Sequence, residues 1–375
     1  MVGLRSEKMS GKTETKSNIS RRQALGVVGG LVVGGVVGAA GGYYAGQVSA
    51  PSAASTVTTT VTQAVSAAAA GTHFDDLSLW YFNGGAAGDI FGSICHKGSM
   101  DARTDLGCKV TDTFSGWDVD TMVSQFREAL AAKPDGICMM GHPGEAALGP
   151  LIDQAYAQGT VVTIQNVDLP NIRAKYATQG CGYVGQILQV AGASLAQKAI
   201  TDYNLQPGDK VMVLGKWGSP GRMVREAASA DTFTKAGMVV DKVLQPDAWA
   251  SAPEEAIPVV TGYIEAHPDL KLIEWAEEQG EVSIKSIMDG AGKAPGSIIQ
   301  IGFDLAPPIL DLFTAGYIQL HILQEPYYQG YFPIVNVCCA IKYKLIGVFM
   351  DTGAGFITKD NAADLKSLVQ AGIQG

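Results

Sequence analysis

No motif in this sequence predicts a familiar catalytic or metal centre. The cysteines and histidines are spread along the chain, at Cys95, Cys108, Cys138, Cys181, Cys338 and Cys339, and at His73, His96, His142, His267 and His321. None of them shows the close spacing that holds zinc or supports thiol redox chemistry. The patterns G-x-S-x-G, G-x-x-x-x-G-K and H-E-x-x-H are absent as well. The sequence therefore predicts no metal and no other cofactor, and ligand binding becomes the first hypothesis.

One glycine-rich stretch matches a nucleotide-binding pattern. Residues 180–185 read Gly-Cys-Gly-Tyr-Val-Gly, which fits G-x-G-x-x-G. In a dinucleotide site this pattern follows a strand and begins a helix. Here it follows a polar segment, and Tyr183 and Val184 are themselves the expected strand. We interpret the match as a coincidence.

From Leu77 onward, predicted strands alternate with predicted helices, and these elements could position a binding site. The apolar runs that predict buried strands are 79–82, 109–111, 136–140, 161–165, 182–184, 210–214, 238–244, 272–275 and 297–302. The segments with helical spacing between the first of these strands are 90–105, 119–132 and 145–158. Strand, helix and strand without hairpin turns predict an α/β fold with parallel sheets, and 375 residues are enough for two of them.

The strand ends indicate where a ligand would bind, and the overall charge indicates which classes of ligand to expect. In open parallel sheets, ligands bind beyond the carboxyl ends of the strands, so the residues that follow each apolar run are the site candidates. The net charge of -9 and the isoelectric point of about 5.1 provide no basic field for phosphates. We therefore expect a small molecule or a protein as partner, and no nucleic acid.

The N-terminus has the layout of a targeting segment. A basic export leader covers residues 1–23, and an apolar, uncharged stretch follows over residues 24–46, long enough to cross about 30 Å of hydrocarbon. The run Ser20-Arg21-Arg22 with Leu25 resembles a twin-arginine export signal. Pro51 directly follows the small residues at which a peptidase would cut, so retention as a membrane anchor is favoured over cleavage. An exported, extracytoplasmic protein is expected.

A Ser-, Thr- and Ala-rich segment, residues 47–76, comes next. Between residues 51 and 72 it contains no charge and no aromatic residue, so it offers nothing from which to build a core. We interpret it as a stalk between the membrane and a folded domain. The cysteines of that domain could form one or two disulfides, or remain buried free thiols.

Three motifs near the C-terminus come in a characteristic order. They are Gly302-Phe303-Asp304 after a strand, Gly316 at a helix end, and Gln324-x-Pro326-x-x-x-Gly330. This order closely resembles the sugar-binding periplasmic proteins of the ribose and galactose type, the type I solute-binding proteins of ABC importers. The resemblance extends from about Leu77 to the C-terminus.

The resemblance implies a two-lobed architecture of the periplasmic-binding-protein-like I class. Each lobe would be a parallel sheet flanked by helices, and three hinge crossings near Gly182, Gln324 and Met350 would join the lobes. Lobe 1 would comprise residues 77–181 plus 325–349, and lobe 2 residues 182–324 plus 350–375. A ligand bound between the lobes would favour the closed form, because only that form contacts it from both sides.

The same resemblance implies the ligand-binding residues. Asp304 and Gln324 match the family's binding Asp and hinge Gln, while Trp249 and Phe91 match aromatic positions that stack on a sugar. The remaining candidates are polar or charged: Asp89, His142, Gln165, Asn166, Arg225, Arg222 (the lesser alternative to Arg225) and Glu277. Gln165 and Asn166 stand where the family often has Asp and Arg, so the sugar type is left open.

Each candidate also has a purely structural interpretation. Asp304 could only cap a helix, Gln324 could only hold the hinge, and Trp249 or Phe91 could be core residues. His142 could cap a loop, and Arg225 and Glu277 could belong to solvated surfaces. These alternatives remain open at the level of sequence.

The expected function is capture of a sugar or related polyol by a monomer that passes it to an ABC transporter permease. A sensor-linked ligand-binding domain is one alternative, and an exported α/β enzyme is another, which turnover would reveal. A sugar-responsive repressor shares the fold, but no DNA-binding helix-turn-helix precedes residue 77.

Overall fold

The computed structural model describes only part of the chain. The described residues are 73–218, 223–250, 252–353 and 355–374. The chain divides into two compact units, Met1–Ala64 and Val65–Gly375, and all described residues belong to the second unit. None of the described helices is both long and apolar enough to cross a membrane.

The expected N-terminal features fall largely outside this part of the chain. The export leader, the apolar anchor helix and the stalk as far as residue 72 all lie outside the described residues. The expected end of the stalk, residue 76, is corrected by Phe74, which is 4% exposed. The Phe74 amide donates to the carbonyl of Leu106, and its ring packs with Leu77 in the domain core. The folded domain therefore includes residue 74.

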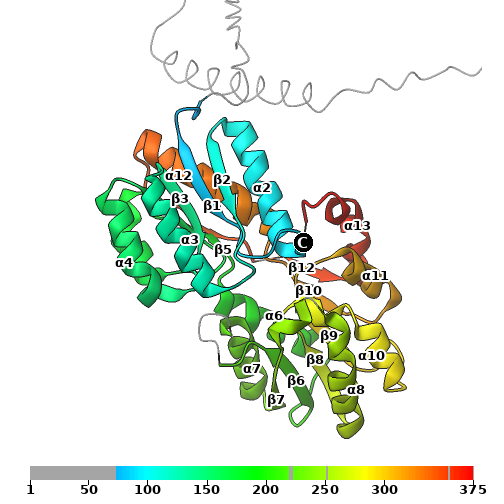
Figure 1. The fold of residues 1–375 in the computed structure, drawn as a ribbon. Helices are drawn as coiled ribbons and strands as arrows, with labels where there is room; N and C mark the ends of the chain where they lie inside the picture. Colours follow the sequence, from blue (N-terminus) through cyan, green and yellow to red (C-terminus); the bar gives the residue numbers. More distant parts are fainter. Residues whose placement is uncertain (1–72, 219–222, 251, 354, 375) are drawn as a thin grey trace, which may run out of the picture. The chain divides into compact units, whose positions relative to one another are not determined.

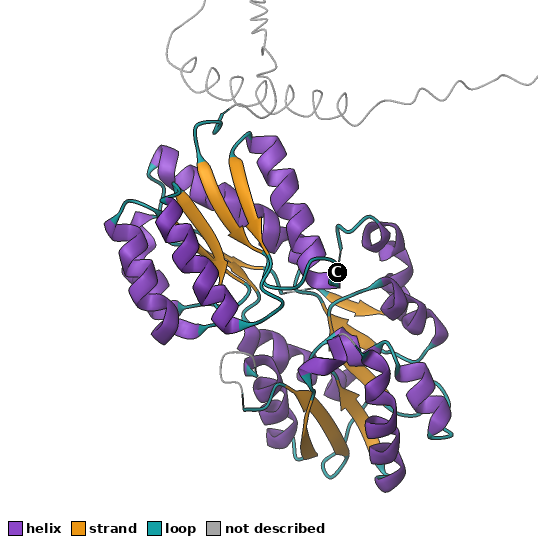
Figure 2. Ribbon diagram, in the orientation of Figure 1, coloured by secondary structure: helices purple, strands orange, loops and turns teal. Residues whose placement is uncertain are grey.

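The described domain contains two six-stranded sheets with helices on both faces (Figures 1 and 2). The first sheet has the order β11-β5-β4-β3-β1-β2, and all of its pairings are parallel. The second has the order β12-β10-β9-β8-β6-β7 and is parallel except for β12, which runs antiparallel to β10. We call each sheet with its helices a lobe. The predicted α/β class with two parallel-dominated sheets is confirmed.

The bounds of β1 to β9 follow the nine predicted apolar runs closely, whereas β10, β11 and β12 match none of these runs. In the first sheet they are β1 Ser78–Phe82, β2 Lys109–Thr113, β3 Gly136–Met140, β4 Val161–Gln165, β5 Tyr183–Gly185 and β11 Phe349–Asp351. In the second they are β6 Lys210–Gly215, β7 Val239–Leu244, β8 Leu270–Glu274, β9 Ile299–Phe303, β10 Leu320–Ile322 and β12 Phe356–Thr358. Central strands such as β3 are buried along their whole length, because helices cover both faces of the sheet.

The helices form four hydrophobic clusters, two for each sheet. In the first lobe these helices are α2 Ile90–Leu106, α3 Val119–Ala132, α4 Gly144–Ala157, α5 Pro170–Tyr176 and α12 Pro326–Tyr343. In the second they are α6 Leu188–Asp202, α7 Val224–Lys235, α8 Ala256–Ala266, α9 Glu278–Glu281, α10 Ile284–Gly290, α11 Pro307–Ala315 and α13 Lys359–Gln370. Helices α2 and α12 pack on one face of the first sheet, and α3, α4 and α5 pack on the other.

The chain passes between the two sheets three times. The crossings follow β5, β10 and β11, because β5 and β11 pair within the first sheet while β10 and β12 belong to the second. The crossing that follows β10 contains Gln324. The boundary expected at residue 182 comes too early, since β5 still pairs with β4 as far as Val184. Likewise, Met350 pairs with Val184 inside the first sheet, so the third crossing follows Asp351.

All six cysteines are free thiols in the structure, and five of them are buried. Cys95, Cys108, Cys138 and Cys338 belong to the hydrophobic cluster beneath α2 and α12. Of the two alternatives for the cysteines, the structure therefore has the buried free thiols.

Candidate functional site

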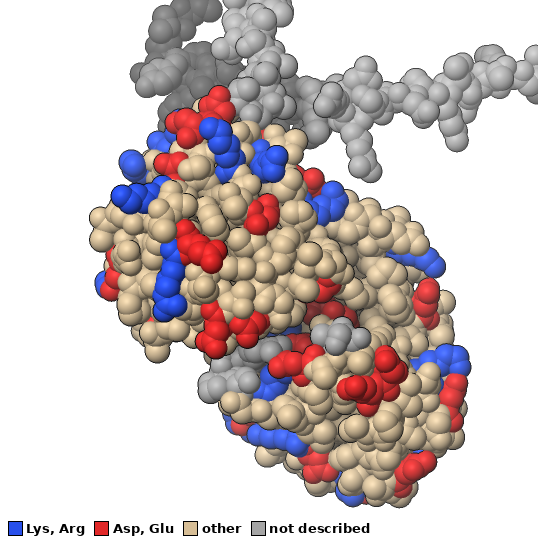
Figure 3. Space-filling model, viewed as in Figure 1, with Lys and Arg blue, Asp and Glu red and all other residues tan. Residues whose placement is uncertain are grey.

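A cavity of about 300 Å³ lies where the carboxyl ends of the two sheets face each other. Its lining residues come from both lobes: Phe91, Gly116, Trp117, Asp118, His142, Asn166, Val167, Leu188, Arg225, Asp247, Glu277, Glu278, Gln279, Asp304 and Gln324. Acidic side chains gather around the hollow between the lobes (Figure 3). The volume is at the lower end of the range for small-molecule sites.

The first lobe lines the cavity with aromatic rings. Trp117 follows β2, and its ring lies 5.8 Å from that of Phe91 and 5.5 Å from that of His142, centre to centre. Its backbone is left-handed, with φ at 63°, and its amide donates to the carbonyl of Gly84 at 2.8 Å. A rigid aromatic surface of this kind can stack on the C–H face of a ring-shaped ligand.

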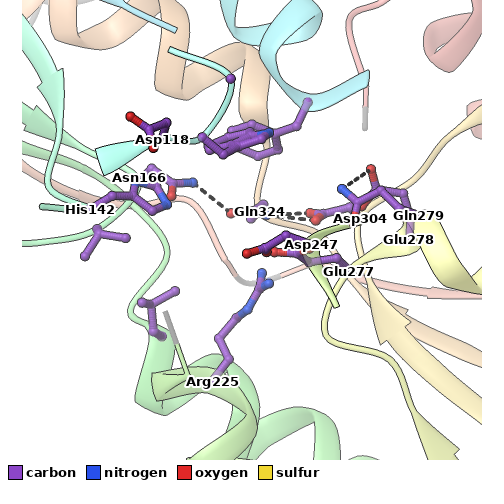
Figure 4. A pocket seen from close by; sticks show the side chains of 15 residues that line it. Asp118, His142, Asn166, Arg225, Asp247, Glu277, Glu278, Gln279, Asp304 and Gln324 are labelled. Atoms are coloured by element: carbon purple, nitrogen blue, oxygen red, sulfur yellow. Dashed lines mark hydrogen bonds between the residues drawn. The ribbon is translucent and has the colours of Figure 1, made fainter. Parts of the chain in front are cut away.

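Amide side chains at the hinge connect the two lobes. Asn166 follows β4, and its Nδ2 donates to Gln324 Oε1 at 3.3 Å and to Gln329 Oε1 at 3.0 Å. Gln324 follows β10, and its Nε2 donates to both carboxylate oxygens of Asp304, at 2.7 and 2.9 Å. Figure 4 shows this chain of amides leading from Asn166 to Asp304. The Gln324 side chain thus has contacts on both sides of the hinge.

Asp304 and Arg225 provide opposite charges in the second lobe. Asp304 directly follows β9 and is 6% exposed. The Arg225 guanidinium donates to the carbonyl of Ala276 at 2.7 Å and lies 4.1 Å from the centre of the Phe303 ring. Burial raises the pKa of Asp304, and the charge of Arg225 opposes that rise without cancelling it. Both groups are planar and can form paired hydrogen bonds with neighbouring hydroxyls.

A buried lysine supports the acidic part of the lining. Lys216 follows β6 and is 5% exposed, and its Nζ lies 2.9 Å from both Asp247 Oδ1 and Glu277 Oε2. Glu278 is 3% exposed and accepts a hydrogen bond from the neighbouring Gln279 at 3.4 Å. Burial raises the pKa of Glu278 well above its usual range, and the nearby charge of Asp304 raises it further. Glu278 can therefore offer a hydroxyl as well as an acceptor.

Seven of the candidate residues line the cavity together. They are Phe91, His142, Asn166, Arg225, Glu277, Asp304 and Gln324. Their proposed roles toward a ligand remain predictions. Within the described part of the chain, no group of three His, Cys, Asp or Glu side chains is placed to hold a metal ion.

Three other candidates lie away from the cavity lining, and Arg222 lies outside the described residues. Trp249 is 2% exposed and packs against Trp275 in the core of the second lobe, so the structure corrects its expected stacking role. Gln165 is fully buried, and its Nε2 donates to the carbonyl of Phe82. Asp89 caps α2, where its carboxylate accepts from the amides of Ala86 and Gly92.

Sequence reasoning missed several lining residues, of which Trp117, Asp118 and Asp247 are the clearest. Trp117 and Asp118 follow β2, which continues two residues beyond the predicted run. Asp118 caps α3 by accepting from the amide of Thr121. The general rule that ligands meet the residues after each strand would have found both of them. Asp247 follows β7 by the same rule, whereas the family resemblance indicated Trp249 in this segment.

Beneath the cavity the second lobe buries further carboxyl groups. Glu274, the last residue of β8, is fully buried, and neither of its carboxyl oxygens has a hydrogen-bond partner among the described residues. Glu226 of α7 is 1% exposed, and its Oε2 also has no such partner. Burial raises the pKa of both residues, well above the usual range for Glu274. In the folded state these groups therefore favour the protonated form.

We expect the free energy of unfolding to fall as the pH rises from about 5 to 8. A carboxyl whose pKa is raised on folding contributes most below its unfolded value, 4.5 for Glu, and that contribution is lost as the pH rises through the folded pKa. The slope can reach about 1.4 kcal/mol per pH unit for each proton involved. Surface groups with lowered pKa values, such as Asp153 and Asp289, titrate below pH 3.8 and act outside this window.

Denaturant unfolding between pH 5 and 8 measures this dependence. Glu274→Gln replaces the neutral carboxyl by an amide of the same shape, so the variant should unfold with a flatter pH slope and be more stable than the natural chain at pH 8. Glu265→Gln, a change outside the buried cluster, serves as the control. A Glu274→Gln chain that is less stable than the natural chain at pH 8 would contradict the expectation.

Comparisons with known proteins agree with this architecture. Residues 81–343 match the family model described as a periplasmic binding protein domain. The xylose/arabinose-binding protein of Sulfolobus acidocaldarius is 27% identical over 285 residues, which cover 70% of this chain and 67% of that protein. The D-allose-binding periplasmic protein of Escherichia coli is 23% identical over 235 residues, or 61% of this chain and 74% of that protein.

Solved structures show the same fold. A solute-binding protein of Burkholderia graminis in complex with D-arabinose has a TM-score of 0.67 at 23% identity, covering 77% of this chain and 97% of its own. A carbohydrate transporter protein of Acidothermus cellulolyticus in complex with myo-inositol has a TM-score of 0.67 at 21% identity, covering 80% and 99%. Together with the family match, two lobes around a polar, aromatic-lined cavity show that this chain belongs to the periplasmic binding protein family, with curated relatives among its sugar-binding members.

Proposed function

We propose that this protein captures a monosaccharide between its lobes and delivers it to an ABC importer without changing it chemically. The observation that carries the proposal is the joint lining of the cavity. Trp117 and Phe91 from the first lobe offer apolar faces, while Asp304 and Arg225 from the second lobe offer paired donors and acceptors. A sugar has the matching combination of C–H faces and hydroxyls in fixed directions.

We infer that a pentose is the preferred ligand. The cavity volume of about 300 Å³ suits a small ligand. A curated relative is named a xylose/arabinose-binding protein, and a similar structure holds D-arabinose. A deoxy analogue lacks a hydroxyl and so leaves a buried polar group of the protein without its hydrogen-bond partner. Deoxy analogues should therefore bind several orders of magnitude more weakly than the complete sugar.

Closure of the hinge is the motion that we propose for capture. Hydrogen bonds join the three crossings: the Thr352 hydroxyl donates to the carbonyl of Gln324 at 2.7 Å, and Gln186 Nε2 donates to the carbonyl of Leu323 at 3.2 Å. A ligand held by both lobes shifts the population toward the closed form. The proposal also includes export of the protein, its anchoring through residues 24–46 and a monomeric state. Protease treatment of intact cells tests the location, because an exported domain is accessible to the protease.

Titration of the full chain with sugars tests the function. D-xylose, L-arabinose, D-arabinose, D-ribose, D-allose and myo-inositol are added while tryptophan fluorescence is recorded, because Trp117 lines the cavity. We expect a saturable response at one ligand per chain, with a Kd near 1 µM, or about -8 kcal/mol, for a pentose. Calorimetry checks the stoichiometry, and chromatography of the released ligand shows whether it is unchanged. No saturable response to any of these sugars would refute the function.

A further inference from the structure

A fully buried histidine lies directly beneath the binding carboxylate. His321 is the central residue of β10, opposite Gly302 of β9 and Ile357 of β12, and it does not line the cavity. The ring of Phe313 lies 5.1 Å away in an edge arrangement. An imidazole in such apolar surroundings needs a hydrogen-bond partner for each ring nitrogen.

Both ring nitrogens of His321 have partners. Nδ1 lies 2.7 Å from the backbone carbonyl oxygen of Asp304, and Nε2 lies 2.9 and 3.1 Å from the two carboxylate oxygens of Glu281. A carbonyl oxygen can only accept, so Nδ1 carries the hydrogen and donates it. The carboxylate oxygens of Glu281 are acceptors for Nε2, and a ring that donates from both nitrogens is an imidazolium. Glu281, in α9, is as deeply buried as His321.

Gly302 makes room for this ion pair. A Cβ atom at residue 302 would lie 3.0 Å from His321 Nε2 and 3.0 Å from Glu281 Oε2. Such a contact is tight, so a side chain at this position would push the pair apart. The glycine that begins Gly302-Phe303-Asp304 is thus adapted to the pair beneath the site.

Asp304 needs support because its backbone is unfavourable. Its φ is 70°, in the left-handed region that residues with a Cβ rarely occupy. Its amide donates to the carbonyl of Ile322 at 3.3 Å, its carbonyl accepts from His321, and its carboxylate accepts from Gln324. Strand β10 and the hinge residue after it therefore hold Asp304 at three points.

We propose that His321, paired with Glu281, is a positioning residue that holds the left-handed backbone of Asp304 and thereby aims its carboxylate into the cavity. The inference rests on the proposed function, since it assigns Asp304 to the ligand. Without the Nδ1 donor, the Asp304 carbonyl would be a buried acceptor lacking its partner. The backbone around Asp304 would then move away from its left-handed conformation. A displacement of about 1 Å is enough to misalign the paired hydrogen bonds of a binding carboxylate.

The charges around His321 favour its protonated state. Burial by itself lowers the pKa of His321, but the charge of Glu281 and the hydrogen bonds to Glu281 and Asp304 outweigh it, so the pKa is raised. Three further charged groups, Arg225, Glu277 and Glu278, interact with Asp304 and reach His321 only through it. Strands β9 and β12 contain no titratable residue.

The helices nearest to β10 bring other charges only at their surfaces. On α6, Lys198 pairs with Asp202, and both side chains are about one third exposed. On α11, Asp311 is exposed and pairs with Lys366. The titration that matters is therefore that of the His321 ring. As the pH rises through the raised pKa of His321, which lies above the ordinary value of 6.5, ring deprotonation would leave an Nε2 lone pair facing the carboxylate, and sugar affinity should fall.

Calorimetric titration of the full chain with the best-binding sugar tests the proposal through two histidine variants. His321→Gln should weaken binding by about 10- to 100-fold at pH 6, because a hydrogen bond from a charged donor is lost. His267→Gln is the matched control, since His267 also contacts a backbone carbonyl in the second lobe but lies outside the cavity. Its Kd should stay within about twofold of the natural value. Equal affinities of the natural chain and His321→Gln would overturn the proposal.

Glu281→Gln separates positioning from folding. The glutamine amide can donate to a neutral Nε2 while Nδ1 still donates to Asp304, so this variant should bind sugar nearly as well as the natural chain. Its affinity should no longer fall between pH 6.5 and 9. ¹⁵N NMR of the ring should show both His321 nitrogens protonated at pH 6.5 in the natural chain and a neutral ring in Glu281→Gln. An unchanged pH profile in Glu281→Gln, or a neutral ring in the natural chain, would overturn the proposal even if His321→Gln did not fold.

The failure of this inference differs from the failure of the proposed function. If the natural chain binds a sugar and His321→Gln binds it equally well, only the positioning role is lost. If the natural chain binds none of the sugars, the function fails and the inference falls with it.

Discussion

Asp304→Ala is expected to weaken sugar binding by about 1000-fold. The carboxylate is buried, aligned by two hydrogen bonds from Gln324 Nε2, and lies in the cavity. Two hydroxyls that pair with a charged acceptor contribute about 1.5–3 kcal/mol each, so losing both costs roughly two to four powers of ten in Kd. Calorimetric titration with the best-binding pentose measures the loss.

Asp304→Asn and a surface variant make this test specific. Asparagine tolerates the left-handed backbone at φ 70° and keeps the side-chain shape. The affinity of Asp304→Asn for the sugar should therefore fall by about 100-fold, through loss of the charge alone. Asp311→Ala, on the exposed face of α11, should bind sugar as the natural chain does. Thermal unfolding of all three variants shows whether they are folded. A Kd for Asp304→Ala within threefold of the natural value would remove Asp304 from the site.

Trp117→Ala is expected to weaken binding by about 30-fold. Stacking one face of an indole on a sugar removes roughly 80 Å² of apolar surface from water, which at about 25 cal/mol per Å² corresponds to about 2 kcal/mol. Trp117→Phe keeps an aromatic ring, and its affinity for the sugar should fall by less than about tenfold. Both replacements face the same left-handed backbone as the natural residue, so the backbone cost largely cancels between them.

Two readouts separate the contribution of Trp117 from general damage. Calorimetry on Trp117→Phe should still detect binding while the ligand-induced fluorescence change largely disappears, because the reporting indole is gone. Trp80→Ala is the control: Trp80 is a half-buried tryptophan of β1 that packs near Phe82 and does not line the cavity. Its affinity should be unchanged. If Trp80→Ala and Trp117→Ala lost affinity equally, the stacking role of Trp117 would be wrong.

Much of the fold could be predicted because its strands are buried on both faces. A strand covered by helices on either side is a continuous apolar run, as in Gly136–Met140. After Val161–Gln165, the polar residue Asn166 marks where the strand ends. This signal located β3 and β4 correctly, and with them Asn166. It also placed Asp304 after β9. Short hinge strands carry less signal, which explains why β5 and β11 were assigned to the wrong side of the crossings.

The two tryptophans show where local sequence stops being informative. Trp249 follows β7 by five residues, and Trp117 follows β2 by four. Only the packed structure distinguishes them: Trp249 fills the core beside Trp275 and Gly280, whereas the left-handed turn at Gly116 and Trp117 directs the second indole to the cavity. The two residues are of the same type and follow their strands at nearly the same distance, so the sequence alone could not distinguish them.

The order of apolar runs and of the residues that end them was enough to predict two parallel-dominated sheets and the sheet edge at which the cavity lies. The motif order, through its resemblance to the sugar-binding periplasmic proteins, indicated Asp304 and Gln324 as candidates, because motifs are properties of neighbouring residues. The tertiary structure alone decided that Lys216 supports the acidic lining, that Trp249 is a core residue, and that His321 reaches the carbonyl of Asp304. Side-chain directions and long-range contacts depend on how sheets and helices pack in space, which spacing along the chain does not encode.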